Sequence, residues 1–437
     1  MRKESCCVML FEKMRPEQFI AFGFAAVILL GAGILMLPVV HNHGVGVAFI
    51  DALFTSTSAV CVTGLIAIDT ADTFNFFGQA VVAALIQAGG LGVTSIGVSL
   101  IILTGGRVSF KERIVVKEAM NLNSMGGVVK LVKSVLVLTL CFEGVGTLLS
   151  FIVFHQDYEP LNALWISIFH SIAAFNNSGF DILGGLENLI PYQHNMLLNL
   201  TTACLIIFGG LGFLVIREVM LKRSFKKFSL HTKVVITMTV SLLAVGTMLL
   251  KATESISLLG AFFFSASART AGFSTYPVRE FTNAGLFLLI ILMFIGASPG
   301  STGGGIKTTT TFTLLCNAFS VATNKQCSAF KRRIPISVIR KAFVVAILAL
   351  VIIFVNSYLL IILEPRHRFI DLFFEVVSAF GTVGLSTGIT PDLCFVSKMI
   401  IILTMYIGRL GPLTVAMLWY FKPSSNASYS EESITIG

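Results

Sequence analysis

Four short polar clusters, each ending in a glycine and a bulky apolar residue, interrupt a chain that is otherwise strongly apolar. They lie at 58–65, 173–180, 266–273 and 378–385. Glycine adopts backbone conformations that other residues avoid, and non-helical backbone at membrane depth persists only inside protein or beside a water-filled cavity. Backbone carbonyls can replace the water shell of a bare cation. Four such loops therefore indicate one selectivity filter around a single axis, for a monovalent cation, with potassium favoured.

The composition places the chain in a membrane. Of its 437 residues, 55% are hydrophobic and 12% are charged, which excludes an ordinary soluble protein. Eight apolar runs mostly approach the ~20 residues that a spanning helix needs: 19–40, 77–103, 132–153, 196–219, 234–250, 284–296, 342–363 and 399–420. We predict an all-α membrane protein with eight membrane helices in four pairs, and a re-entrant loop inside each pair.

One unit recurs four times, and internal repeats take precedence over local interpretation. Each unit is a helix (M1), a half-helix with its filter loop, and a second helix (M2). The half-helices are predicted at 49–59, 161–174, 257–268 and 369–379. The expected divisions are a cytoplasmic segment 1–18, repeat 1 at 19–106, repeat 2 at 107–222 with a cytoplasmic amphipathic lead-in, repeat 3 at 223–325, repeat 4 at 326–421 and a tail at 422–437. The predicted fold is therefore four M1–pore loop–M2 repeats around a pseudo-fourfold pore.

Each half-helix should point the partial negative charge of its C-terminus at a cavity below the filter, which favours a dehydrated cation. The carbonyls that follow should form stacked rings with one contribution from each repeat. The predicted filter residues are Val62, Thr63, Gly64, Leu65, Asn177, Ser178, Gly179, Phe180, Thr270, Ala271, Gly272, Phe273, Thr382, Val383, Gly384 and Leu385. The metal ion expected there is potassium, at the filter carbonyls.

The distribution of charge predicts the orientation. Basic residues crowd into 2–15, 107–133, 217–233 and 325–341, whereas 41–75 and 156–195 contain no Lys or Arg. The positive-inside rule then places both termini in the cytoplasm and the four glycine loops towards the exterior. The net charge of +9 suits contact with anionic membrane lipid and is not interpreted as nucleic-acid binding.

These residues resemble the filter signatures of the Trk/Ktr/HKT superfamily of potassium transporters, and most closely those of its KtrB-type subunits. The resemblance is carried by 61–65, 176–180, 269–273 and 381–385, and extends through 87–92, 228–233 and 408–412. In this family a serine replacing the first filter glycine accompanies sodium preference in some plant members. The intact Gly64 therefore implies potassium.

The resemblance also implies an assembly in the bacterial cell membrane. It implies a homodimer in which each chain forms its own pore, resting on a cytosolic ring of nucleotide-binding regulatory subunits similar to KtrA. The sequence has no P-loop and no dinucleotide-binding fingerprint after a strand. We therefore expect no organic cofactor in this chain and a nucleotide only on a separate regulatory subunit. Whether sodium is coupled or merely activates flux stays open.

A gate is predicted inside the second helix of repeat 3, within 296–310. Its glycines, proline and hydroxyls are incompatible with a regular helix. The predicted gate residues are Gly296, Ala297, Ser298, Pro299, Gly300, Ser301, Thr302, Gly303, Gly304 and Gly305, with Arg409. Arg409 lies inside the last apolar run, where a charge is costly and normally points inward to a partner. We expect it to contact carbonyls or hydroxyls of this loop; a static kink and a purely structural arginine are the alternatives.

Other residues carry weaker signals. Glu143 lies in a predicted helix and is interpreted as a paired structural carboxylate, with a proton relay as the alternative. Arg269 lies beside the third filter cluster and is expected to point behind it, since a cation inside a cation pore would repel. The eight cysteines are scattered and contain no CxxC pair, so they predict no disulfide framework.

Two other functions are alternatives to a channel-like pore. An alternating-access potassium/sodium or potassium/proton symporter commonly uses inverted repeats, whereas each unit here has two crossings and all four share one orientation. An intramembrane enzyme would need a motif such as HExxH or Gly-x-Ser-x-Gly, and the sequence contains neither. The parallel repeats favour a pore that is not an enzyme.

Overall fold

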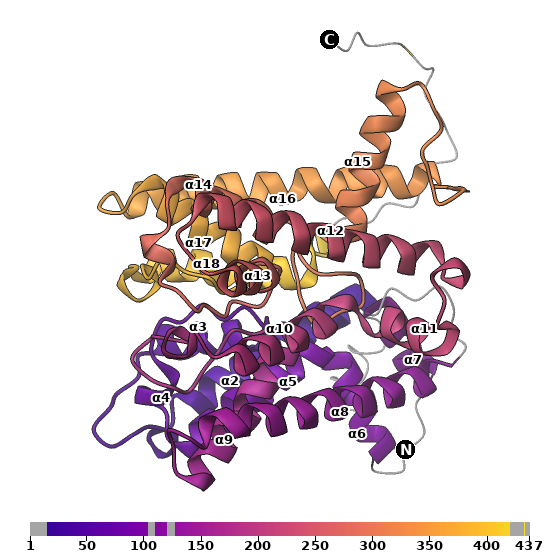
Figure 1. The fold of residues 1–437 in the computed structure, drawn as a ribbon. Coiled ribbons are helices and arrows are strands. Elements are labelled where there is room, and N and C mark those ends of the chain that lie inside the picture. The colour runs from indigo at the N-terminus through magenta and orange to yellow at the C-terminus, as the bar shows by residue number, and fades with distance from the viewer. Residues whose placement is uncertain (1–14, 104–109, 120–126, 420–431, 433–437) are drawn as a thin grey trace, which may run out of the picture.

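The computed structural model describes residues 15–103, 110–119, 127–419 and Glu432, and it is mostly helical (Figure 1). The predicted N-terminal segment up to residue 14 and the tail 422–437, apart from Glu432, lie outside the described residues. The strands in the described part form one small antiparallel hairpin, β1 (Ser328–Ala329) and β2 (Arg332–Arg333). The all-α prediction is confirmed.

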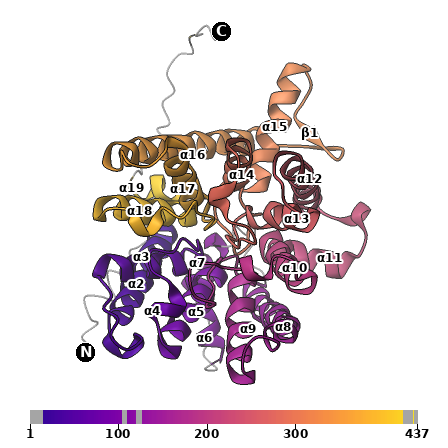
Figure 2. The ribbon, with the colours of Figure 1, turned by 60° about the vertical axis from the view of Figure 1, so that its left-hand side comes forward.

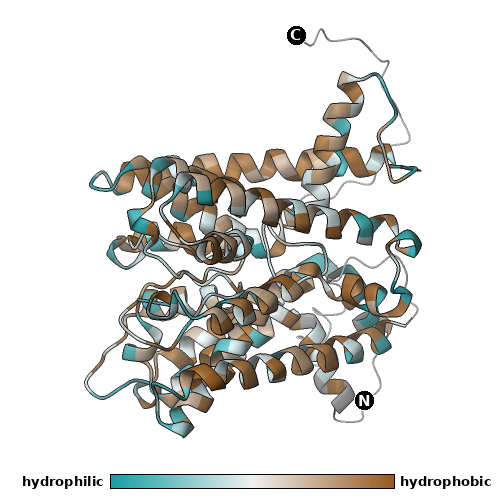
Figure 3. Cartoon of the chain, in the orientation of Figure 1, coloured by the Kyte–Doolittle hydropathy of each residue, from teal (hydrophilic) through white to brown (hydrophobic). Residues whose placement is uncertain are grey.

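The first helix of every repeat is long and apolar enough to cross a bilayer. These helices are α2 (Pro16–Leu35), α8 (Val128–Phe154), α12 (Leu230–Thr253) and α16 (Ile336–Leu363). In the orientation of Figure 3, hydrophobic residues cover α8 and α16, and hydrophilic residues gather in the loops at the helix ends.

A half-helix follows each long helix. The four are α3 (Phe49–Val60), α9 (Pro160–Phe175), α13 (Leu258–Ser267) and α17 (Phe369–Gly381). The longest has 16 residues and spans about 24 Å at 1.5 Å per residue, less than the ~30 Å hydrocarbon core. The half-helices therefore end inside the protein, and each passes directly into one of the polar clusters.

The second helix of each repeat is broken. The break in repeat 3 was predicted, whereas those in repeats 1, 2 and 4 correct the expectation of uninterrupted spans. The pieces are α5 (Phe76–Leu91) and α6 (Val93–Leu103), α10 (Met196–Leu211) and α11 (Phe213–Lys222), α14 (Asn283–Phe294) and α15 (Thr308–Ala322), and α18 (Phe395–Leu410) and α19 (Pro412–Trp419). The α10–α11 and α18–α19 pairs bend by 95° and 98°. Gly92, Gly212 and Gly411 stand at three of the breaks with φ of 85°, 90° and 88°, in the region that glycine enters most readily.

Short elements complete the chain. They are α4 (Thr70–Thr73), α7 (Phe110–Ala119), and the 3₁₀ turns η1 (Pro38–Val40), η2 (Ile190–Tyr192), η3 (Phe225–Lys227), η4 (Val278–Glu280) and η5 (Thr390–Asp392). Figure 2 shows the four repeats as four groups of helices, with the loops that follow the half-helices converging between them.

Repeats 1, 2 and 3 share a packing contact between the long helix and the half-helix. The half-helix serine donates a hydrogen bond to a long-helix carbonyl oxygen: Ser56 to Ile28 (2.7 Å), Ser171 to Glu143 (2.6 Å) and Ser265 to Leu243 (3.1 Å). A glycine makes room for each hydroxyl, because a Cβ atom on Gly31, Gly146 or Gly246 would lie 2.5, 2.4 or 2.4 Å from it. Small residues thus hold the half-helices close to the long helices.

Candidate functional site

The four polar clusters meet in a closed ring. A Cβ atom added to Gly64 would lie 2.1 Å from the carbonyl oxygen of Ser178, in the next cluster along the chain. The ring continues from Gly179 to the carbonyl oxygen of Ala271 (2.6 Å), from Gly272 to that of Val383 (2.3 Å), and from Gly384 back to that of Thr63 (2.1 Å). Each glycine therefore abuts the backbone of the following repeat, and the fourth repeat closes onto the first around one centre.

The backbone has the same unusual conformation in every cluster. The residue two places before each glycine has a left-handed φ: Val62 (56°), Asn177 (59°), Thr270 (80°) and Thr382 (48°). The glycines Gly64, Gly179, Gly272 and Gly384 have φ of 86°, 71°, 78° and 93°. Such conformations in residues other than glycine are uncommon and are held in place by their surroundings. Reversing handedness at alternate residues turns successive carbonyl groups towards the same side of the chain.

Each cluster is hydrogen-bonded back to its own half-helix. The amide N–H groups of Thr63, Ser178 and Val383 donate to the carbonyl oxygens of Ser58, Ala173 and Ser378 at 2.8, 2.8 and 2.9 Å. The hydroxyl oxygens of Ser58 and Ser378 accept from the N–H groups of Gly64 and Gly384 at 3.1 and 3.0 Å. These contacts use the N–H groups of the clusters and fix the loops against the helix ends.

The structure brings together the predicted filter residues of all four repeats, and all sixteen are buried. On the side of the ring away from the half-helix ends, a recess of about 130 Å³ is lined by Gly64, Gly179, Gly272 and Gly384. Asp181 and Asn188 also line this recess. It is the mouth of the site on that side.

Asp181 places a carboxyl group at this mouth. Its Oδ2 accepts from Asn188 Nδ2 (2.9 Å) and its Oδ1 from the N–H of Leu183 (3.1 Å), while Asn188 also donates to the Gly179 carbonyl oxygen (3.1 Å). Burial raises the pKa of Asp181 to about 7; the hydrogen bonds from Leu183 and Asn188 oppose the rise, and the nearby Asp69 carboxylate adds to it. The sequence places Asp181 among the carboxylates of the predicted outer face, but it does not show that Asp181 lies at the ring, and Asn188 was not selected. The two residues follow the second cluster and have no matching pair in the other repeats.

The segment 295–307, between α14 and α15, is called here the intramembrane loop, and it contains the ten predicted gate residues 296–305. It bonds to the broken helix of repeat 2. The N–H of Ser298 donates to the Gly210 carbonyl oxygen (3.1 Å), and that of Thr302 to the Gly209 carbonyl oxygen (3.3 Å). The break in α10–α11 thus supplies the carbonyls that hold the loop.

The loop also touches the half-helix side of two of the polar clusters. The N–H of Gly304 donates to Thr382 Oγ1 at 3.0 Å. A Cβ atom on Gly303 would lie 2.1 Å from Thr270 Oγ1. Thr382 and Thr270 are the residues with left-handed φ in the fourth and third clusters. The intramembrane loop therefore lies directly against the inner end of the ring.

Arg409 links this loop to repeat 1. Its side chain is half-buried, and the guanidinium donates to the carbonyl oxygens of Thr302, in the loop, and of Gly89, near the break of α5–α6. The contact with the loop is the one expected from the sequence, whereas the contact with Gly89 was not foreseen. Arg409 stands where the other repeats have Gly90 and Gly210, within Gly-Gly-Leu-Gly in repeats 1 and 2 and Gly-Arg-Leu-Gly in repeat 4.

A second cation acts on the same loop. Lys307 Nζ donates to the carbonyl oxygens of Gly303 (2.7 Å) and Gly304 (3.4 Å). Beyond the loop is a recess of about 400 Å³, whose lining includes Lys307, Arg409 and Gly303. The ring, the intramembrane loop and this recess follow one another. Between the two recesses, carbonyl oxygens of the loop accept hydrogen bonds from Lys307 and Arg409.

The two isolated charges beside the ring differ in their surroundings. Glu143 accepts from Asn176 Nδ2 (3.1 Å) and Gln87 Nε2 (3.4 Å), so it belongs to a polar network at the end of α9. Arg269 is buried next to the third cluster, and in the described part of the chain its Nε has no hydrogen-bond partner.

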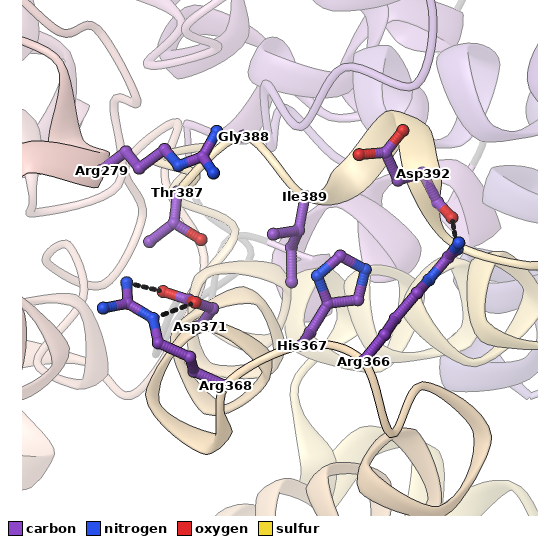
Figure 4. Close-up of a pocket in the computed structure, with 9 residues that line it drawn as sticks. All are labelled: Arg279, Arg366, His367, Arg368, Asp371, Thr387, Gly388, Ile389 and Asp392. Carbon is purple, nitrogen blue, oxygen red and sulfur yellow. Dashed lines mark hydrogen bonds and ion pairs between the residues drawn. The ribbon is translucent and has the colours of Figure 1, made fainter.

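A basic pocket of about 380 Å³ is lined by residues of repeats 3 and 4 (Figure 4). Arg368 forms a bidentate ion pair with Asp371 (2.8 and 2.9 Å). Arg366 donates to the Asp392 carbonyl oxygen (2.5 Å) and lies 3.5 Å from Glu364. Because arginines repel cations, this pocket is not interpreted as part of an ion pathway.

Comparison with known proteins gives concordant results. The sequence matches the profile of a protein family described as TrkH, cation transport protein, over residues 18–258 and 228–430. It is 39% identical to the potassium/sodium uptake protein NtpJ of Enterococcus hirae, with 98% of each chain covered. It is 37% identical to the Ktr system potassium uptake protein B of Bacillus subtilis, with 97% of each covered. The crystal structure of the potassium transporter TrkH from Vibrio parahaemolyticus shares the fold, with a TM-score of 0.73, 18% identity, and 94% and 86% of the two chains covered.

Proposed function

This chain belongs to the TrkH family of cation transport proteins, a family of transporters and not of enzymes, and we propose that it is the ion-translocating subunit of a potassium uptake system. Potassium passes through the ring of four clusters in a channel-like manner. The names of the two relatives, a potassium/sodium uptake protein and a potassium uptake protein, support potassium as the transported ion.

The closed ring of backbone contacts among the four glycines carries this proposal. Stacked carbonyl oxygens replace the hydration shell of a dehydrated cation. The repeated left-handed residues favour carbonyl groups that point to one side, while N–H groups of the clusters bond back to the half-helices. Among these carbonyls, that of Gly179 also accepts from Asn188. The C-terminal ends of α3, α9, α13 and α17 add a field that attracts a cation.

The intramembrane loop is the proposed gate. It contacts the inner side of the filter clusters, and Arg409 and Lys307 donate to its carbonyl oxygens. In this closed arrangement, protein cations occupy positions that a permeating potassium ion would otherwise use. Opening requires these contacts to break, since the ion has to pass between the filter and the inner recess.

The orientation and the partners are also proposals. Exposed basic residues on α11, the β1–β2 hairpin and the start of α16 support a cytoplasmic face that contacts anionic lipid and a nucleotide-binding regulatory ring. The name of the Bacillus relative refers to a Ktr system, which supports a separate regulatory component. We further propose a homodimer in the bacterial cell membrane, with both termini in the cytoplasm.

Rubidium uptake into vesicles tests the proposed function directly. Purified protein is reconstituted in liposomes, and uptake is followed under an imposed inside-negative potential, with and without sodium. We expect uptake that follows the potential and is reduced by external potassium. An absolute requirement for sodium, with a fixed stoichiometry, would instead favour the alternating-access symporter. No uptake by folded protein, with or without its regulatory subunit, would contradict the proposal.

The carboxyl group at the outer mouth predicts a dependence on external pH. With its pKa raised to about 7, Asp181 carries its negative charge above that pH and loses it below. A negative charge at the mouth raises the local cation concentration, so uptake should rise about threefold from about pH 6 to about pH 8. Asp181→Asn should remove this rise.

The matched control is Glu187→Gln, which removes an exposed carboxylate from the same loop and should keep the rise. Both variants are compared with the parent protein at one imposed potential. A rise of equal size in Asp181→Asn would show that another group is responsible.

A further inference from the structure

Two cysteines, one in α15 and one shortly after it, have their sulfur atoms in contact. Cys316 lies in α15, which begins directly after the intramembrane loop, and its Sγ is 3.5 Å from the Sγ of Cys327. Both are free thiols. A disulfide bond has an S–S length of about 2.05 Å, so the sulfur atoms need to approach by only about 1.5 Å. We propose that Cys316 and Cys327 are a redox modification site, a dithiol that closes reversibly into an intramolecular disulfide and restrains α15.

The fold holds the two thiols together. After α15 the chain turns back, with the N–H of Lys325 donating to the Ser320 carbonyl oxygen at 2.8 Å. The β1–β2 hairpin then keeps Cys327 in place, because the N–H of Ile334 donates to the Cys327 carbonyl oxygen at 3.0 Å. Cys316 Sγ also contacts the Ser328 carbonyl oxygen at 3.6 Å. The short separation thus follows from a backbone-bonded turn and hairpin.

The two thiols differ in accessibility, and this difference predicts which of them reacts first with an oxidant. Cys327 is 9% exposed, and burial followed by the hydrogen bond with Cys316 raises the pKa of its thiol. Cys316 is partly exposed and meets a reagent first. Lys331, Arg332 and Arg333 lie in or next to the hairpin, and their charge attracts an anionic reagent.

The oxidant is a small-molecule disulfide such as oxidised glutathione. The Cys316 thiolate attacks one sulfur of this reagent, which forms a mixed disulfide and releases one small thiol. Cys327 then loses its proton and attacks the Cys316 sulfur, which releases the second small thiol. The two protein thiols are oxidised to one disulfide, and the reagent is reduced to two thiols. A reducing thiol reverses both steps.

The position of the pair suggests its effect. The disulfide ties the last turns of α15 to the hairpin that leads into α16, and α15 is continuous with the proposed gate. This step rests on the proposed function, both for the gate and for the cytoplasmic location, where thiols are normally reduced. Oxidation should therefore restrain the gate only when the small-thiol pool becomes oxidised, and it should lower potassium flux.

The modification is tested without measuring transport. The full-length protein in liposomes is treated with oxidised glutathione, and free thiols are blocked with a maleimide. The masses of the tryptic peptides are then measured by mass spectrometry. Lys325 separates the two cysteines, so trypsin releases a disulfide-linked pair lighter by two hydrogen atoms than its separate peptides. We expect this pair in the parent protein and in Cys394→Ser, and its loss in Cys316→Ser and Cys327→Ser. A lasting glutathione adduct on Cys316 without the linked pair would overturn the proposal.

The regulatory effect is measured on the same samples. Oxidation should lower rubidium uptake about fivefold, the lower end of typical coupling between sites, and dithiothreitol should restore it. The loss should be absent in Cys316→Ser. Complete formation of the linked pair with unchanged uptake would overturn the restraint of α15. Because the peptide readout does not depend on transport, failure of the proposed potassium transport is distinguishable from failure of the dithiol.

Discussion

Replacing Gly64 by serine is expected to reduce the preference for potassium over sodium by about tenfold, which corresponds to about 1.4 kcal/mol. A Cβ atom at this position would lie 2.1 Å from the Ser178 carbonyl oxygen, and the φ of 86° is unfavourable for serine. The backbone therefore has to move, and the hydroxyl group becomes an additional oxygen at the ring. The measurement is the ratio of rubidium to sodium uptake in liposomes.

Gly33→Ser is the matched control, because a Cβ atom on Gly33 in α2 meets nothing within 4 Å. The same chemical change outside the ring should leave the ion ratio as in the parent protein. Both variants are first compared by size-exclusion chromatography to show that they remain folded. An ion ratio in Gly64→Ser equal to that of the parent would contradict the assignment of the first cluster to the filter.

Arg409→Ala is expected to raise potassium flux by about tenfold or more. The guanidinium donates to Thr302 in the intramembrane loop and to Gly89 in repeat 1. Hydrogen bonds to charged groups contribute about 1.5–3 kcal/mol each, so their loss should favour the open loop. The measurement is the initial rate of rubidium entry into liposomes without the regulatory subunit, where a closed gate would otherwise dominate.

Two controls separate gating from general damage. Arg340→Ala removes an exposed arginine at the start of α16 and should leave the flux unchanged. Arg409→Lys keeps the charge but not the planar, forked donor, so its flux should lie between those of the parent and Arg409→Ala. Shortening the intramembrane loop should also raise flux. Unchanged flux in both the shortened protein and Arg409→Ala would exclude the proposed gate.

The repeated architecture is readable from the sequence because each half-helix ends in the same kind of cluster. The predicted half-helix at 49–59 is observed as α3 (Phe49–Val60), and that at 369–379 as α17 (Phe369–Gly381). The pattern combines a short apolar stretch, small residues at its end, and a glycine followed by a bulky apolar residue. It occurs four times, so the repeats reinforce one another where a single occurrence would be ambiguous.

The breaks in the second helices of repeats 1, 2 and 4 were not predicted, because a run of apolar residues has the same hydropathy whether it is straight or bent. The signal was present in Gly89-Gly90-Leu91-Gly92 and its counterparts, yet glycine in a membrane helix also serves close packing. The contact of Arg409 with Gly89 and the pairing of Cys316 with Cys327 depend on how distant segments pack. Neither spacing nor composition contains that information.

Each quarter of the ring is encoded by its own segment of the chain, so each can change independently of the others. If the ring is the proposed filter, a substitution in one cluster alters one quarter of the surroundings of the ion and leaves the other three intact. Preference among cations can therefore be adjusted in small increments. The arginine at the break of repeat 4, where repeats 1 and 2 have glycine, is an example. A chain with four unequal repeats can carry a side chain of the proposed gate in one repeat and keep the backbone of the proposed filter in all four.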